Sequence, residues 1–257
     1  MKAPFDPPVS LEQPVSLEQP APSLLHETNE LGQSVGLTVP DWRSASIPTD
    51  VPMLGTYCRV ERLAARTHAA DLFAANTVDG RGANWTYLPY GPFPDLVSYQ
   101  GWVNSVSGGA DPLFFAVVDA STKRAVGVAS YLRVDTDHGT IEVGHINYSP
   151  LLQRSRAGTE AMYLMMQRVF EDWGYRRYEW KCNALNQPSR SAATRLGFVY
   201  EGTFLHSNVV KGRNRDTAWY AITDDNWPRI KNQFQAWLDP ANFDDAGNQL
   251  TSLRAVD

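Results

Sequence analysis

The segment that decides the fold reads Ser149-Pro150-Leu151-Leu152-Gln153-Arg154-Ser155-Arg156-Ala157-Gly158-Thr159-Glu160-Ala161, and it joins a predicted strand to the longest predicted helix. Polar and basic residues therefore stand just before a helix N-terminus. Free backbone N–H groups and the helix dipole favour phosphate groups there, and the guanidinium groups of Arg154 and Arg156 add positive charge. The segment predicts a phosphate-binding loop, with an ordinary solvated loop before an amphipathic helix as the alternative.

Strands and helices alternate on both sides of this segment. Short links between the second, third and fourth strands predict antiparallel hairpins, whereas the helix of residues 157–173 requires a parallel join. The order predicts an α/β (α+β) fold, in which helices flank a mixed, mostly antiparallel central sheet. Strand-like runs are residues 56–63, 113–119, 125–134, 140–148, 177–184, 199–211 and 216–223. Three helices are expected to begin after caps at Thr67, Asp95 and Asn186. Two more are expected to start at about Ala157 and at Asp224 or Asp225.

The composition is that of an acidic, soluble protein. The 257 residues are 43% hydrophobic, and 23 basic against 28 acidic residues give a formal charge of −5. This balance excludes wholesale disorder and a strongly basic nucleic-acid-binding surface. We find neither an apolar run of the roughly 20 residues that a membrane helix needs nor a signal peptide, so we expect a cytoplasmic protein that binds neither nucleic acid nor membranes. The five histidines and two cysteines lack metal-ligand spacing, which predicts no metal site.

The two ends of the chain differ from its middle. Residues 1–54 are rich in proline, and the six residues 9–14 are repeated at once as residues 15–20. This composition predicts an extended or disordered N-terminal arm, although Pro-rich segments also dock on partner domains. Residues 239–257 read as a polar, turn-rich tail. One domain is therefore expected, over residues 55–238.

A second motif follows the strand of residues 177–184. Asn186 and Ser189 stand at a helix start, and Gly197-Phe198 ends that helix. Together with the loop of residues 153–158 and the helix start of residues 159–161, this order resembles the GCN5-related N-acetyltransferase superfamily. It is most similar to the branch that acetylates ribosomal-protein N-termini, and the resemblance covers about residues 57–222. The middle glycine of the family's loop is Arg156 here, which either reaches a phosphate or spoils the loop.

The resemblance implies an N-acetyltransferase that uses acetyl-CoA. The pyrophosphate would lie on the loop, the pantetheine arm would pair with the end of the strand of residues 140–148, and Asn186 would bind that arm. The cofactor-binding residues that the resemblance implies are Ile146, Asn147, Tyr148, Gln153, Arg154, Ser155, Arg156, Ala157, Gly158, Thr159, Asn186 and Ser189.

The resemblance also gives Ser189 a catalytic role, protonating the thiolate leaving group, with a first-turn serine that bonds the backbone as the alternative. The base has several candidates, because the family's glutamate corresponds by spacing to Asn208. Glu142 is the first candidate, with a purely structural acid as the alternative, and His145 and His206 are further options. Strand alternation puts Glu142 and His145 on opposite faces unless a bulge intervenes.

The acceptor end of the site is expected in the loop between the first two helices. Its four aromatic residues either wall a pocket that contacts a cation or plug the core. Asp216 would orient the substrate amine, or else close a turn and pair with Arg213 or Arg215. The predicted substrate residues are Trp85, Tyr87, Tyr90, Phe93 and Asp216.

The acceptor itself is expected to be a small-molecule amine or a protein N-terminus, and the acidic net charge agrees with a cationic one. A non-catalytic acyl-CoA-binding or sensor module with a degenerate site is the competing interpretation. We expect a monomer or a homodimer.

Overall fold

The computed structural model describes residues 25–253, which fall into two compact units that divide between Trp42 and Arg43. The smaller unit holds a hairpin of β1 (His26–Thr28) and β2 (Ser34–Gly36). The predicted Pro-rich repeat at residues 9–20 lies outside the described residues. Residues 43–54 belong to the larger unit, where the backbone N–H groups of residues 45 and 46 donate to the carbonyls of residues 136 and 173.

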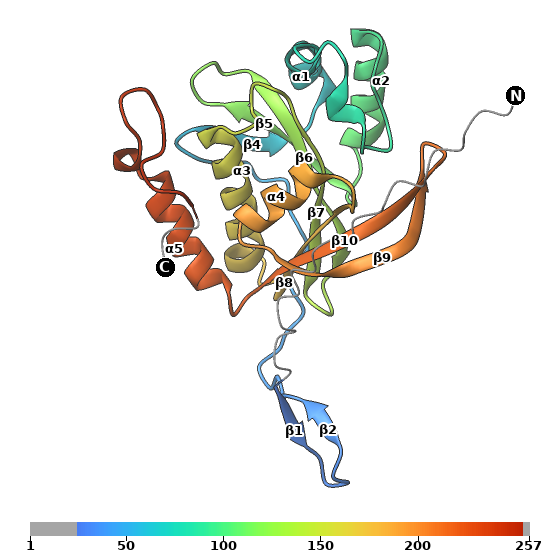
Figure 1. The fold of residues 1–257 in the computed structure, drawn as a ribbon, viewed down its shortest axis with the longest axis vertical. Coiled ribbons are helices and arrows are strands. Elements are labelled where there is room, and N and C mark those ends of the chain that lie inside the picture. Colours follow the sequence, from blue (N-terminus) through green and yellow to red (C-terminus); the bar gives the residue numbers. More distant parts are fainter. Residues whose placement is uncertain (1–24, 254–257) are drawn as a thin grey trace, which may run out of the picture. The chain divides into compact units, whose positions relative to one another are not determined.

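The larger unit is built on an eight-stranded sheet (Figure 1). Within the described sheet every pair of neighbours is antiparallel except β7 and β8, which the long helix connects. The predicted mixed, mostly antiparallel sheet flanked by helices is therefore confirmed. In spatial order the strands are β3 (Met53–Leu54), β4 (Cys58–Arg62), β5 (Leu113–Asp119), β6 (Ala125–Asp135), β7 (Thr140–Tyr148), β8 (Arg177–Asn183), β10 (Arg213–Thr223) and β9 (Val199–Val210).

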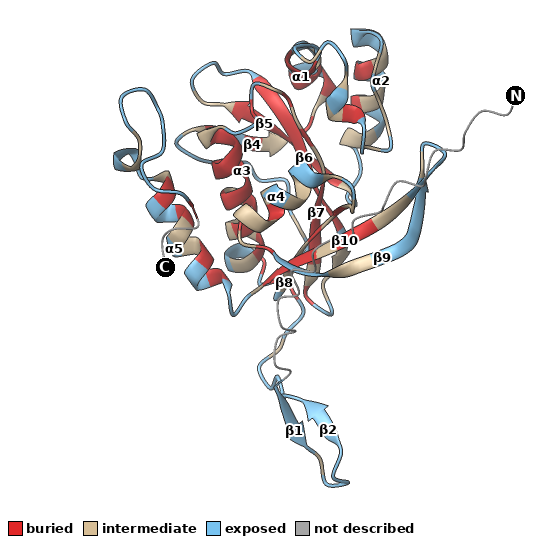
Figure 2. Cartoon of the chain, in the orientation of Figure 1, coloured by how far each residue is buried: buried red, intermediate tan, exposed pale blue. Residues whose placement is uncertain are grey.

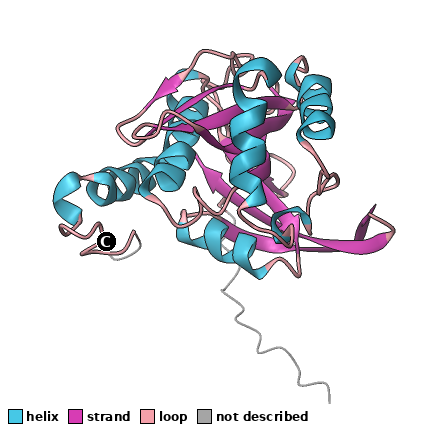
Figure 3. Cartoon of the chain, turned by 90° about the horizontal axis from the view of Figure 1, so that it is seen from above, coloured by secondary structure: helices cyan, strands magenta, loops and turns pink. Residues whose placement is uncertain are grey.

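Helices cover both faces of the sheet (Figure 3). Neighbouring residues Phe114 and Phe115 of β5 point into different apolar cores, because side chains alternate along a strand. The first core lies under α1 and α2, and the second under α3, α4 and α5. Figure 2 shows the deepest burial along the strands between these layers. The helices are α1 (Ala65–Thr77), α2 (Leu96–Ser107), α3 (Arg156–Gln167, continued by a π-helical turn over Arg168–Asp172), α4 (Gln187–Arg195) and α5 (Trp227–Leu238).

Helix ends follow local capping. The predicted cap of α2 is confirmed, because the Asp95 carboxylate accepts a first-turn N–H at 2.8 Å. The predicted cap of α1 at Thr67 is wrong, since that helix already begins at Ala65. The His68 ring, at 3.0 Å, accepts the N–H of Ala64 from within the first turn and so replaces a side-chain cap.

Two further predicted boundaries shift. β10 begins at Arg213 rather than at residue 216, because its hairpin turn needs only Lys211 and Gly212, both with positive φ. The last helix begins at Trp227, after Asn226, and not at the predicted acidic pair of residues 224 and 225.

Glu160, in the first turn of α3, ties that helix to the sheet. Its carboxylate is buried and accepts the backbone N–H groups of Thr56, Tyr57 and Cys58 at 2.8, 2.6 and 2.8 Å. A Cβ at Gly55 would lie 2.3 Å from the Glu160 carboxylate, so a larger residue at this position would displace the carboxylate from these amides. These bonds fix the start of α3, and with it the loop that precedes the helix.

Candidate active site

β7 and β8 run side by side over only part of their length. Their ladder joins Thr140–Val143 to Arg177–Trp180, and beyond it β7 continues along β6 while β8 continues along β10. The facing backbone N–H and C=O groups beyond Val143 therefore have no partner in the described sheet. The two strands open into a V whose backbone groups can bind an extended ligand.

A β-bulge shapes the β7 side of this opening. Between two paired positions β7 carries one residue more than β6, and His145, within that stretch, has a φ of 49°. The extra residue reverses the alternation of side chains. Glu142 and His145 therefore share the face of α1 and α2, where the His145 ring lies 5.0 Å from that of Phe114.

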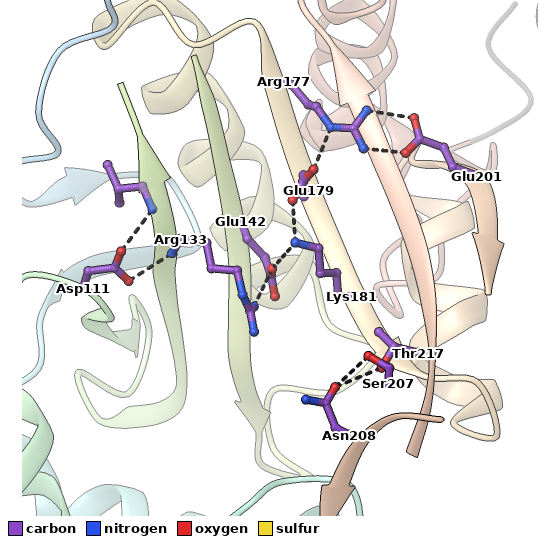
Figure 4. Close-up of polar contacts among 11 residues, drawn as sticks. Asp111, Arg133, Glu142, Arg177, Glu179, Lys181, Glu201, Ser207, Asn208 and Thr217 are labelled. Atoms are coloured by element: carbon purple, nitrogen blue, oxygen red, sulfur yellow. Dashed lines mark hydrogen bonds and ion pairs between the residues drawn. The ribbon is translucent and has the colours of Figure 1, made fainter. Parts of the chain in front are cut away.

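Glu142 belongs to a chain of alternating charges on this face (Figure 4). Its Oε2 accepts from Arg133 at 2.7 Å and from Lys181 at 2.9 Å. The side chains of Glu142 and Lys181 are 4% and 8% exposed, so this pairing is buried. Glu142 thus serves as counter-ion to two cations, and its role as the base stays a prediction. The full chain runs Arg133, Glu142, Lys181, Glu179, Arg177 and Glu201.

Arg133 is directed toward Glu142 by a local distortion of β6. It has a φ of 51°, and the Asp111 carboxylate accepts the N–H groups of Arg133 and Val134, each at 3.0 Å (Figure 4). Asp111 therefore stabilises the backbone conformation that holds the Arg133 guanidinium beside Glu142.

His145 lies in an aromatic setting. Its ring stacks on Tyr90 with the centroids 5.7 Å apart, and Nδ1 is 3.3 Å from the Tyr90 hydroxyl. Burial, and then the charges of Arg133 and Arg215, lower the pKa of His145 below its usual 6.5. Burial also raises the pKa of Tyr90, so its hydroxyl keeps its proton. The imidazole is therefore neutral at physiological pH, the form that accepts a proton.

The segment before α3 is folded as a capped helix start. Ser155 caps the helix, since its Oγ accepts the Gly158 N–H at 2.9 Å and donates to the Leu152 carbonyl at 2.7 Å. The first two amides of the helix have no acceptor in a preceding turn. A Cβ at Gly158 would lie 2.7 Å from the Leu152 carbonyl oxygen, so glycine is required there.

The two arginines of this loop have different surroundings. Arg154 is exposed and has a φ of 57°, which turns the chain into the helix. The guanidinium of Arg156 lies 4.3 Å from the ring centroid of Phe243 and 5.2 Å from that of Tyr57. A Cβ at Gly247 would meet it at 3.2 Å. The residue that replaces the loop glycine thus anchors the C-terminal segment, while the loop keeps its cap.

The end of β7 offers mainly backbone to the opening. The side chains of Ile146 and Tyr148 pack into the core under α3. Asn147 and Ser149 are 2% and 0% exposed, and their side-chain polar atoms have no hydrogen-bond partner among the described residues. Gln153 holds this end in place, because its Nε2 donates to the Tyr148 carbonyl at 2.8 Å.

Ser189 is oriented from two sides. Asn186 is the predicted cap of α4, and its side-chain oxygen accepts the Ser189 N–H at 3.2 Å. The Ser189 Oγ accepts from the buried Trp180 indole at 3.0 Å, which leaves its own proton available for donation. Burial raises the pKa of the neighbouring Cys182 thiol, and the Ser189 hydroxyl opposes that rise. Trp180 is the last β8 residue of the ladder with β7, so the hydroxyl stands where the strands part.

Three of the four aromatic residues predicted for an acceptor pocket belong to the core under α1 and α2. Trp85 and Phe93 have centroids 5.3 Å apart, and Tyr90 lies 4.5 Å from the ring of Trp102. Tyr87 is exposed and donates from its hydroxyl to the carbonyl of residue 185 at 3.2 Å. The packing therefore gives Trp85 and Phe93 the core role, while Tyr90 reaches the site through His145.

The hairpin of β9 and β10 reaches this aromatic loop. The ammonium group of Lys211, in the hairpin turn, donates to the carbonyls of Trp85 and Gly91, each at 2.8 Å. The hairpin and the loop are thereby held together beside the open face of the sheet.

Asp216 holds a bulge within that hairpin. Its carboxylate accepts the N–H of His206 at 2.7 Å and the side chain of Asn214 at 3.0 Å, and these bonds lower the pKa of Asp216. The predicted contact of Asp216 with the amine stays a prediction. Asn208 pairs with Arg215 in the ladder, on the same face as Glu142.

The sequence interpretation missed three cations, Arg133, Lys181 and Arg215. Arg133 and Lys181 bind Glu142, while Arg215 acts electrostatically on both Glu142 and Cys182. For Lys181 the available signal was the alternation of charges at residues 177, 179 and 181, which puts them on one face of a strand.

Two kinds of site are absent from the part of the chain that is described. No group of three or more His, Cys, Asp or Glu side chains in residues 25–253 is placed to hold a metal ion. Over the same residues, every helix is too short or too polar to cross a membrane.

Known proteins share this architecture. A family model described as an acetyltransferase (GNAT) domain matches residues 61–199. The crystal structure of a GCN5-related N-acetyltransferase from Brucella melitensis is 44% identical, with a TM-score of 0.82 over 84% of this chain and 97% of its own. A probable acetyltransferase of the GNAT family from Chromobacterium violaceum ATCC 12472 is 36% identical, with a TM-score of 0.70 over 76% and 96% of the two chains.

A more distant structure shares the fold alone. The microcin C7 self-immunity acetyltransferase MccE, in complex with acetyl-CoA and AMP, is 17% identical, with a TM-score of 0.58 over 69% of this chain and 98% of its own. No curated protein matches the chain significantly. The family model spans more than half of the 257 residues, and the Brucella protein is related over nearly its whole length. Acetyl transfer is the chemistry these relatives have in common, and the chain belongs to the GCN5-related N-acetyltransferase (GNAT) family.

Proposed function

We propose that this protein moves an acetyl group from acetyl-CoA to a primary amine, either a small molecule or a protein N-terminus. The observation that carries the proposal is the V between β7 and β8. It exposes unpaired backbone between an anion-binding helix start and a face that holds a neutral histidine. An extended molecule with phosphates at one end and a thioester at the other suits this arrangement. The narrower assignment to the branch acting on ribosomal-protein N-termini rests on the loop and Asn186-Ser189 motifs.

The residues of the loop fit the coenzyme. Gly158 leaves room for backbone alone, and the first amides of α3 are free to bind the pyrophosphate oxygens. The backbone of residues 146–148 would pair with the pantetheine arm, as an added strand pairs with a sheet edge. When bound, acetyl-CoA supplies the activated acetyl group, and residues 153–159 together with Asn186 hold it.

Ser189 is the proposed proton donor to the leaving thiolate. Its Oγ accepts from Trp180 through one lone pair, and this bond leaves the hydroxyl proton available for donation. Because Trp180 is buried, the indole also fixes where this donor stands. Placing the proton at the departing sulfur removes the need for a free thiolate to leave.

His145 is the proposed acceptor of the amine proton, directly or through one water molecule. A primary amine is mostly protonated at neutral pH and attacks only when deprotonated. In the tautomer whose Nδ1–H donates to the Tyr90 hydroxyl, the lone pair of Nε2 is available for that proton. Glu142 is already paired with Arg133 and Lys181, so we assign it to holding the two cations.

The test combines binding with turnover. The full chain is titrated calorimetrically with acetyl-CoA, and thiol release is followed over a panel of amino acids, polyamines and short peptides. We expect binding, release with at least one amine, and a kcat lower by roughly 100-fold in Ser189→Ala. Ser191→Ala, an exposed serine two residues further along α4, is the matched control and should keep the wild-type rate.

Each outcome has a distinct meaning. Failure to bind acetyl-CoA would overturn the proposal and the loop assignment together. Binding without turnover of any amine would support the sensor interpretation, which the engagement of Arg156 with Tyr57 and Phe243 favours. Full activity in Ser189→Ala would remove that residue from the mechanism.

A further inference from the structure

Arg215 is a partly buried cation with no counter-ion among residues 25–253. Its Nε is buried and has no hydrogen-bond partner, and no described carboxylate forms an ion pair with its guanidinium. Burying a guanidinium N–H without an acceptor is costly, because its solvation is lost and nothing replaces it. A free-energy cost of this kind is expected where a ligand supplies the missing partner.

Arg215 lies on the same face of the sheet as Glu142 and His145, the proposed acceptor of the amine proton. Trp219 pairs with Lys181 across the ladder, and the Lys181 ammonium is 3.8 Å from the Trp219 ring centroid, so the two share a face. Alternation along β10 puts Arg215 on that face as well. Its charge also acts on His145 and Glu142, which places the guanidinium near the proposed base.

The neighbouring charges are already balanced without Arg215. The chain of ion pairs from Arg133 to Glu201 contains three cations and three carboxylates in alternation (Figure 4). Arg215 therefore adds one net positive charge to the face. The buried Nε1–H of Trp219, also on β10, is a second donor with no acceptor among the described residues. Both unmet groups on this strand are thus donors.

We propose that the acceptor amine carries an anionic group, a carboxylate or a phosphate, that pairs with Arg215. This inference rests on the proposed function, because it names the class of amine that the site takes. A guanidinium binds either anion through two parallel N–H donors, so both remain within the same chemistry. The site would then select against polyamines and other purely cationic amines, although the chain as a whole is acidic.

Matched pairs of amines test this without requiring turnover. The full chain, saturated with CoA, is titrated calorimetrically with alanine against alaninamide and with phosphoethanolamine against ethanolamine. We expect the anionic member of at least one pair to bind roughly 10-fold or more tightly, and the pair that shows it identifies the anion. Arg215→Met should reduce this preference to about 2-fold or less, whereas Arg215→Lys, which keeps the charge, should retain part of it.

The controls separate this inference from the proposed function. Arg229→Met removes an exposed arginine of α5 and should keep the wild-type preference. Equal binding within both pairs, binding of neither member, or an unchanged preference in a folded Arg215→Met variant would overturn the anionic acceptor. Turnover of neutral amines with no such preference would overturn it while leaving the acetyltransferase proposal intact. If the chain does not bind acetyl-CoA but the same titrations without CoA still show the preference for the anionic amine, the anionic ligand is supported and the acetyltransferase proposal is overturned.

Discussion

Gly158→Ala tests whether the loop before α3 is built on a close backbone approach. The new Cβ would stand 2.7 Å from the Leu152 carbonyl oxygen and 3.2 Å from the ring of Tyr148. The carbonyl belongs to the loop itself, so the loop must move for the methyl group to fit. The same oxygen accepts from the Ser155 hydroxyl, whose Oγ accepts the N–H of residue 158. Displacement therefore also weakens the cap of α3.

The magnitude follows from three opposing terms. Alanine in place of glycine inside a helix stabilises it by about 0.5–1 kcal/mol. Overpacking against backbone costs about 1–3 kcal/mol, and a weakened N-cap costs about 1 kcal/mol. We expect Gly158→Ala to lower the free energy of unfolding by about 1–3 kcal/mol. Because the loop amides shift with the carbonyl, we expect acetyl-CoA binding to weaken by roughly 10-fold or more.

Gly101→Ala is the matched control, since the same substitution is made inside a helix where a Cβ meets nothing within 4 Å. It should raise the unfolding free energy by about 0.5–1 kcal/mol and leave acetyl-CoA binding unchanged. Urea denaturation and calorimetric titration measure both quantities. If Gly158→Ala proves as stable as Gly101→Ala and binds acetyl-CoA as wild type does, the close approach has no role in the loop.

Four further predictions concern charges in and around the site. Because the pKa of His145 is lowered, kcat/KM should stay level through neutral pH and fall only below pH 6.5. Arg133→Met removes one cause of the lowered pKa, so it should move this fall in kcat/KM to higher pH. A pH–rate profile that does not shift in the variant would contradict the assignment of His145. The free energy of unfolding should also fall as pH drops below 6.5, because His145 is protonated at a higher pH in the unfolded chain than in the folded one. Thermal melts at several pH values should show a weaker pH dependence in His145→Asn. Glu142→Gln and Lys181→Met should each cost about 3 kcal/mol in urea denaturation, and the double variant clearly less than the sum; strict additivity would show that the pair is not coupled. Arg156→Ala should lower stability by about 1 kcal/mol and speed proteolysis after residue 243, and unchanged cleavage would show that its ring contacts do not hold the C-terminal segment.

Local sequence signals predicted most of the elements but not their exact ends. The Asp95 and Asn186 caps are recognisable because the capping oxygen stands three residues before the amide it accepts. The start of α1 could not be predicted in this way, because the N–H of Ala64 donates to the ring of His68, and histidine is not one of the usual capping residues. The early start of β10 depends on a positive φ at Lys211, and lysine is not a residue type that favours this conformation.

The face on which a side chain lies was harder to predict. Alternation predicted Glu142 and His145 on opposite faces, and a single extra residue in β7 brought them to the same one. The aromatic loop read equally well as a pocket wall or a core plug, because composition carries no information on which side of a ring faces solvent. Its contacts with the α1 and α2 core decided for the plug in Trp85 and Phe93.

Local sequence patterns predicted the order of strands and helices from β4 onward, the polar segment before α3, and the Asn186-Ser189 helix start. Each of these depends on residues within a few positions of one another, so turn chemistry, capping and periodicity suffice to predict them. Three features depend on the folded chain: the point where β7 and β8 part, the pairing of Glu142 with Arg133 and Lys181, and the lack of a counter-ion for Arg215 among the described residues. Those features join residues tens of positions apart, and electrostatic pairing depends on distance in space and on burial, which only the folded chain defines.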